Sequence, residues 1–144
     1  MILAVDDDPG RYDYLRVLLN ERGDDAPRFV VATCRECVES HIPHATAILL
    51  DFDLDGREEC ARCNGWIDVT NATAYLDAVI ARGVPVIVSS CSSNANRKHL
   101  VTQLHERGVK VAGIAADHFG VEREWLGTLW VWGVVSDRGG PHGR

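Results

Sequence analysis

Short apolar runs alternate with amphipathic segments along the whole chain. The runs are five to eight residues long, which is typical of buried parallel strands. We expect strands at residues 2–6, 28–33, 46–52, 84–90 and 109–116. The intervening segments carry apolar residues at helical spacing. We expect helices from Pro9 to a stop at Gly23, over 34–41, from Val69 to a stop at Gly83, over 94–107 and over 121–133.

This alternation predicts an α/β fold with a doubly wound five-stranded parallel sheet, in the order 2-1-3-4-5. Right-handed crossovers place helices on both faces of such a sheet. We expect one domain over residues 1–135 and a flexible, Gly-rich polar tail over 136–144.

Composition narrows the class of protein. Apolar residues make up 46% of the 144 residues, and the formal net charge is −6. A negative chain is not expected to bind nucleic acid generally, because phosphate backbones attract basic proteins. The first residues lead directly into a strand without the basic start of a signal peptide, and no apolar run is long enough to cross a bilayer. We therefore expect a cytoplasmic protein without membrane contact.

Carboxylates follow two strands that are neighbours in this order. Asp6 and Asp7 end the first strand, and Asp51 and Asp53 follow the third. Acidic side chains crowded at one edge repel each other unless a cation joins them, and Mg²⁺ or Mn²⁺ prefers such oxygen ligands. We predict a metal site made by Asp6, Asp7 and Asp51, with Asp53 as a further candidate. The alternative is a set of ordinary turn and capping residues.

Hydroxyl and amide side chains follow the fourth strand. Ser90, Ser92, Ser93 and Asn94 precede the fourth expected helix, and Arg97 lies in its first turn or so. Backbone N–H groups at a helix N-terminus favour anions, so this loop is a candidate phosphate site. The alternative is a simple Ser/Asn helix cap.

Four of the five cysteines form two Cys-x-x-Cys pairs. Cys34 and Cys37 follow the second strand, and Cys60 and Cys63 lie in the long polar segment after the third. The spacing fits a structural Cys₄ zinc site, which would hold that segment in place. The alternative is four reduced thiols.

These motifs resemble the receiver domains of response regulators over about residues 1–133. The matching runs are ILAVDDD, ILLDFD and PVIVSS. The resemblance implies that Asp6 and Asp7 bind Mg²⁺, that Asp51 is the phosphoryl-acceptor position, and that Ser90 takes the Ser/Thr position. Receivers carry a Lys after the fifth strand, whereas this chain has Asp117 there, which disfavours a stable phospho-aspartate.

A closer resemblance is to the divergent cyclic-phosphate processing receiver domains. It rests on Arg11 after the acidic run and on three motifs, LDFDL at 50–54, NGWIDV at 64–69 and SSN at 92–94. The family often has His in the first and last of these motifs, and this chain does not.

Two functions follow as hypotheses. In the first, the metal acts with Asp51, Asp53, Ser90 and Asn94 as catalytic candidates, while Arg11, Ser92 and Ser93 bind a nucleotide or cyclic phosphate. In the second, a non-enzymatic receiver signals through a protein partner, or self-associates, at its last two helices, which carry Trp125, Trp130 and Trp132. A Toprim nuclease and a haloacid-dehalogenase-type phosphatase fit less well. The first would need Glu where Asp6 stands, and the second would need its nucleophilic Asp near the N-terminus and a longer chain.

Overall fold

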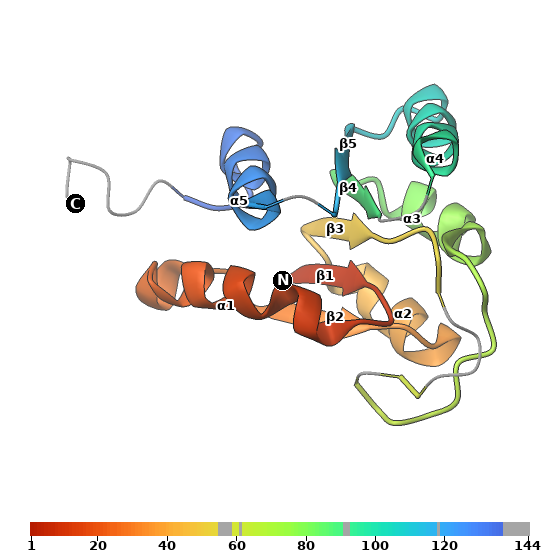
Figure 1. Ribbon diagram of the computed structural model, residues 1–144, viewed down its shortest axis with the longest axis horizontal. Helices are drawn as coiled ribbons and strands as arrows, with labels where there is room; N and C mark the ends of the chain where they lie inside the picture. Colours follow the sequence, from red (N-terminus) through yellow and green to blue (C-terminus); the bar gives the residue numbers. More distant parts are fainter. Residues whose placement is uncertain (55–58, 61, 91–92, 118, 137–144) are drawn as a thin grey trace.

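The computed structural model describes residues 1–54, 59–60, 62–90, 93–117 and 119–136. Its centre is a five-stranded parallel sheet in the order β2-β1-β3-β4-β5 (Figure 1). The strands are β1 (Ile2–Val5), β2 (Phe29–Ala32), β3 (Ala47–Leu50), β4 (Val86–Ser90) and β5 (Val111–Ala115). The predicted doubly wound fold and strand order are confirmed.

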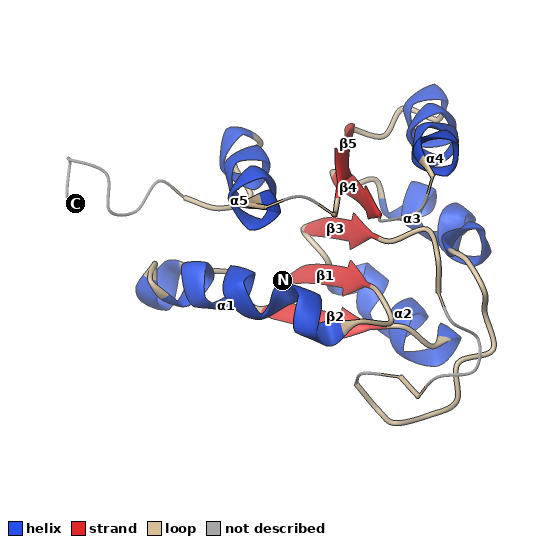
Figure 2. Cartoon of the chain, viewed as in Figure 1, coloured by secondary structure: helices blue, strands red, loops and turns tan. Residues whose placement is uncertain are grey.

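Helices cover both faces of the sheet (Figure 2). They are α1 (Asp13–Asn20), α2 (Arg35–His41), α3 (Leu76–Arg82), α4 (Asn94–Glu106) and α5 (Val121–Val131). Side chains of α1 and α5 pack on one face, and side chains of α2, α3 and α4 pack on the other. No helix in the described part of the chain is both long and apolar enough to span a membrane.

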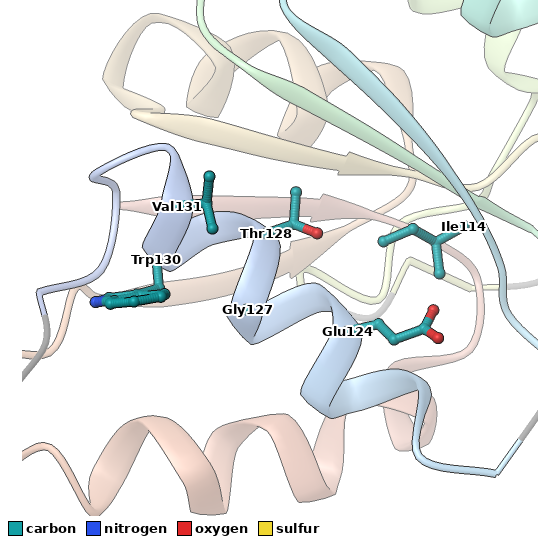
Figure 3. A pocket seen from close by; sticks show the side chains of 6 residues that line it. All are labelled: Ile114, Glu124, Gly127, Thr128, Trp130 and Val131. Atoms are coloured by element: carbon teal, nitrogen blue, oxygen red, sulfur yellow. The ribbon is translucent and has the colours of Figure 1, made fainter.

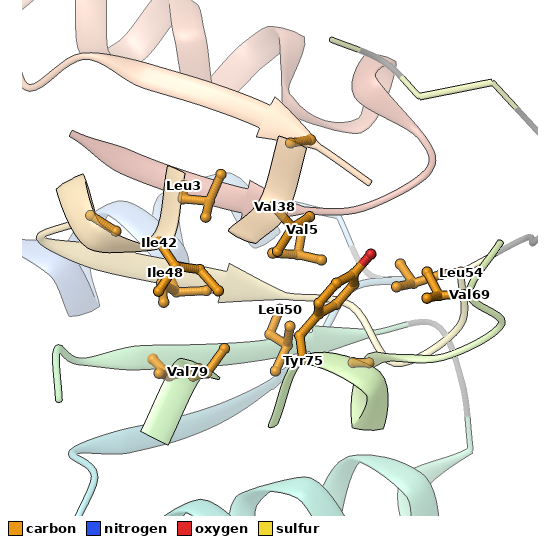
Figure 4. Close-up of a cluster of buried hydrophobic side chains, with 14 of the residues drawn as sticks. Leu3, Val5, Val38, Ile42, Ile48, Leu50, Leu54, Val69, Tyr75 and Val79 are labelled. Atoms are coloured by element: carbon orange, nitrogen blue, oxygen red, sulfur yellow. The ribbon is translucent and has the colours of Figure 1, made fainter. Parts of the chain in front are cut away.

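The two faces of β1 supply both halves of the core. Leu3 and Val5 join the cluster under α2, α3 and α4, part of which Figure 4 shows. Ile2 and Ala4 join the cluster under α1 and α5. A strand buried on both sides must be apolar at every position, and this is why the strands appear as continuous apolar runs in the sequence.

Two of the predicted helices begin with a 3₁₀ turn. A 3₁₀ helix over Pro9–Tyr12 precedes α1, and another over Ala72–Tyr75 precedes α3. The third helical segment therefore starts later than predicted, where the Asn71 side chain accepts a hydrogen bond from the Thr73 N–H. Val69 is buried before this helix begins, so its apolar character reflects burial and not helical periodicity.

Trp125 does not belong to the predicted partner surface. Its side chain is fully buried, and its indole N–H donates to the Ser89 hydroxyl at 2.7 Å. Trp130, on the same helix, is 46% exposed. The domain boundary at residue 135 stays a prediction, since residues 137–144 of the predicted tail lie outside the described residues.

Candidate functional site

Three acidic side chains meet where β1 and β3 end. Val5 and Leu50 are paired in the sheet, so the residues that follow them leave the same edge side by side. The Asp51 N–H donates to the Val5 carbonyl oxygen at 3.0 Å. Carboxylate oxygens of Asp6, Asp7 and Asp51 all lie within 4.8 Å of one another. The structure thus brings together the three predicted metal ligands, in an arrangement able to hold one cation.

Two of these carboxylates are buried. Asp6 is fully buried and Asp51 is 3% exposed. Asp6 accepts hydrogen bonds from the Tyr12 hydroxyl at 2.7 Å and from the Asp8 N–H at 2.9 Å. These contacts fix the orientation of the Asp6 carboxylate.

Arg11 supplies positive charge to the same cluster. Its guanidinium donates to Asp6 at 3.0 Å and lies 3.6 Å from a carboxylate oxygen of Asp51. The predicted role of Arg11 was phosphate binding, and the structure places it against both buried carboxylates. The cluster holds three carboxylates and one guanidinium, which leaves an excess of negative charge.

The pKa values of the buried carboxyls reflect that excess. Burial raises the pKa of Asp6 to about 6, although Arg11 and the Tyr12 hydrogen bond oppose the shift. Burial, followed by the charge of Asp6, raises the pKa of Asp51 to about 7. A divalent cation would offset both causes, since it would replace lost hydration and reduce the repulsion. The donor set therefore fits Mg²⁺ or Mn²⁺, which take carboxylate and water oxygens.

Ser90 extends the cluster toward β4. Its side chain is buried at the strand end, and its hydrogen bond to Asp51 works against the rise in the pKa of that carboxyl. The Arg97 guanidinium reaches back from α4 to the Ser90 carbonyl oxygen at 3.5 Å. The fourth strand thus brings a hydroxyl to the carboxylate cluster.

The loop before α4 acts as a helix cap. Ser93 is the N-cap and accepts from the Asn96 N–H at 3.2 Å, while Asn94 accepts from the Arg97 guanidinium at 2.8 Å. Both side chains are exposed, and Ser92 lies outside the described residues. The capping alternative therefore holds for Ser93, whose hydroxyl accepts from the helix itself.

Asp53 is not part of the cluster that the structure brings together. It is exposed and forms an isolated antiparallel bridge with Asn71, which directs the chain away from the strand edge. Asp117, which stands at the receiver Lys position, is also exposed.

The four predicted zinc ligands also come together. One sulfur from each of Cys34, Cys37, Cys60 and Cys63 lies within 4.8 Å of the others, and all four are free thiols. Burial raises the pKa of Cys37, whereas at Cys60 hydrogen bonds from backbone N–H groups outweigh burial and lower the pKa to about 6.

Three hydrogen bonds in and around the site were not predicted from the sequence. Tyr12 lies in the first predicted helix and was not among the candidate site residues, yet its hydroxyl donates to the Asp6 carboxylate. Thr33 donates through its hydroxyl to the Asp6 carbonyl oxygen, and Tyr75 donates to the Thr33 carbonyl oxygen at 2.6 Å. The one available signal was the presence of polar side chains inside otherwise apolar segments.

Known structures resemble the fold. The chain is similar to a CheY-like response regulator receiver domain from Methanospirillum hungatei JF-1, with 18% identity and a TM-score of 0.62. The match covers 91% of this chain and 90% of that one. A CMP N-glycosidase from Clostridium botulinum, BcmB, matches at 16% identity and a TM-score of 0.49, over 89% of this chain and 96% of the other. Comparison with protein-family models and with curated proteins gives no match. The fold is therefore that of a receiver domain, and function must be argued from the site.

Proposed function

We propose that this receiver-like domain binds Mg²⁺ or Mn²⁺ through Asp6, Asp7 and Asp51, and uses the ion to bind or hydrolyse a nucleotide or cyclic phosphate. The observation that carries the proposal is the convergence of three carboxylates at the ends of two adjacent strands, with the Ser90 hydroxyl beside Asp51. In open parallel sheets, ligands bind at this edge.

The residues around the cluster suit a phosphate group next to a cation. Arg11 and the Ser90 hydroxyl are donors at the carboxylates, and the N-terminus of the 13-residue α4 follows Ser93. Guanidinium, hydroxyl and helix N–H groups all favour phosphate oxygens. A bound divalent ion would supply charge neutralisation for the phosphate and polarise its oxygens.

Replacing Asp51 with asparagine should weaken metal binding by roughly 10- to 100-fold or more, because it removes a charged ligand from the centre of the cluster. Titration calorimetry with Mn²⁺ measures this directly. Asp53→Asn is the matched control, since it makes the same chemical change at an exposed position outside the cluster. Equal affinity in wild type and Asp51→Asn would rule out this site.

A 2′,3′-cyclic nucleotide should bind only when the divalent ion is present. We expect NMR titration to shift the backbone amides of Ser90, Ser93 and Asn94 in Mg²⁺ and to leave them unchanged in chelator. Product analysis of the same samples distinguishes hydrolysis from binding alone. Shifts that are independent of metal, or confined to α5, would contradict the phosphate proposal.

A specific surface favours the second candidate function, signalling through a protein partner. Ile114 of β5 and five residues of α5 line an open hollow of about 500 Å³. Figure 3 shows these side chains, which include Trp130 and Val131, the latter 74% exposed. A contiguous exposed apolar patch on a protein surface is often a site of contact with another protein. The NMR experiment separates the two functions, since only the first predicts metal-dependent changes near Ser93.

A further inference from the structure

We propose that Cys34, Cys37, Cys60 and Cys63 bind one structural Zn²⁺, separately from the carboxylate site. The four sulfurs come from two segments that are far apart in the sequence, the start of α2 and the chain after β3. Figure 1 shows that the chain after β3 passes the ends of β1 and β2 before it returns to α3. A tetrahedral Cys₄ centre needs two such pairs on facing segments.

The sulfur geometry fits zinc better than a disulfide. The Cys34 and Cys63 sulfurs are 3.6 Å apart. Zinc–sulfur bonds of about 2.3 Å in a tetrahedron place sulfurs roughly 3.8 Å apart, whereas a disulfide requires about 2.05 Å. A disulfide would also involve only two of the four sulfurs, and all four are gathered here.

The first pair is held by the helix that it begins. Cys34 is the N-cap of α2, and its sulfur accepts from the Cys37 N–H at 3.4 Å. Cys34 and Cys37 are both buried. The start of α2 thus holds these two sulfurs within 4.8 Å of each other.

The second pair lies in a tight turn whose N–H groups point at the sulfurs. The Arg62 N–H donates to the Cys60 sulfur at 3.5 Å, and the Gly65 N–H donates to the Cys63 sulfur at 3.3 Å. The Cys60 N–H closes the turn by donating to the Gly65 carbonyl oxygen at 2.7 Å. Each sulfur thus receives an N–H from two residues further along, which prepares both for a charged, metal-bound state.

Two residues of this turn match its local geometry. Asn64 has a φ of 59°, in the left-handed region that Asn tolerates better than most residues. A Cβ on Gly65 would lie 3.1 Å from the Cys63 sulfur, which is tighter than ordinary contact. Glycine therefore suits this position, where the backbone passes close to the Cys63 sulfur.

A zinc ion bound to these four sulfurs would link the chain after β3 to the end of β2. The Thr33 N–H donates to the Cys60 sulfur at 3.5 Å, so the strand end contacts the cluster directly. Four protein thiolates complete a tetrahedral shell and leave no open position, which assigns the ion a structural role and not a catalytic one.

The test is the metal content of the full-length chain produced with zinc supplied. We expect about one zinc per chain by elemental analysis in wild type and in Cys91→Ser, which removes the one cysteine outside the ligand set. Cys63→Ser should reduce zinc to a small fraction of that amount. Cobalt substitution of the wild type should give the intense sulfur-to-metal charge-transfer and visible bands of a tetrahedral thiolate centre.

Gly65→Ala keeps all four thiols and provides a second, milder variant. It should bind zinc more weakly in competition with a chelator, because its Cβ crowds the Cys63 sulfur. Wild-type protein that lacks zinc, or whose mass shows the loss of two hydrogen atoms from a Cys34–Cys63 disulfide, would overturn the proposal. The Mn²⁺ titration tests the carboxylate site independently of the zinc measurements. A negative result for one metal site therefore does not contradict the proposal for the other.

Discussion

The metal-free protein is expected to lose stability as the pH rises. The folded-state pKa values of Asp6 and Asp51 are raised to about 6 and about 7, above their ordinary value of 3.8. The folded state therefore binds protons more tightly than the unfolded chain, and this contribution is fully present only below about pH 4. Between about pH 5 and pH 8 the free energy of unfolding should fall by roughly 2–4 kcal/mol.

Chemical denaturation at several pH values in chelator measures this fall. Subtracting the profile of Asp51→Asn isolates the cluster from other titrating groups, since the variant cannot ionise at that position. Mg²⁺ should restore most of the lost stability of the wild type at the alkaline end and have little effect on the variant. Profiles of wild type and variant that run parallel in chelator would contradict the raised pKa values.

Trp125→Ala is expected to lower the free energy of unfolding by roughly 3–5 kcal/mol, because it leaves a large cavity under α5 and removes the partner of a buried hydroxyl. The Trp125 ring is fully buried, packs on Tyr12 with ring centroids 5.2 Å apart, and donates to Ser89. Denaturant unfolding measures the loss.

Trp125→Phe should have a smaller effect. It keeps a six-membered aromatic ring in the core, removes the N–H donor and leaves a smaller cavity than alanine does, so the loss should be about 1–3 kcal/mol. Trp130, a partly exposed tryptophan in the same helix, provides the control. Trp130→Ala should change the free energy of unfolding far less than Trp125→Ala. Similar losses for Trp125→Ala and Trp130→Ala would show that the two rings are not buried as described.

The strands and their order could be predicted from the sequence because both faces of the sheet are covered. Complete burial imposes apolar runs such as Ala47–Leu50. The ends of the elements were less predictable. Val109 was placed in the fifth strand, but it is buried before β5 begins at Val111. An apolar side chain indicates that its position is buried. Burial alone does not show whether that position lies in a strand or in the segment that precedes it.

The sequence predicted the residues of the site whose positions depend only on where two neighbouring strands end. Asp6 and Asp51 follow paired residues of adjacent strands, so the predicted order alone brought them together. Asp53 was less predictable, because its placement depends on a bridge to Asn71. The contacts of Arg11 and Tyr12 depend on the 3₁₀ turn at Pro9–Tyr12, which returns these side chains to the strand that precedes them. Local turn geometry of this kind is not encoded in hydrophobic periodicity.

The position of Tyr12 between the carboxylates and Trp125 gives the protein an internal optical reporter. The Tyr12 hydroxyl donates to Asp6, and its ring packs against the indole of Trp125. Indole emission responds to nearby charge and to the order of its surroundings. Any event that changes the charge on Asp6 therefore alters the fluorescence of a buried tryptophan one aromatic ring away, and the cluster can be followed in solution without an added label.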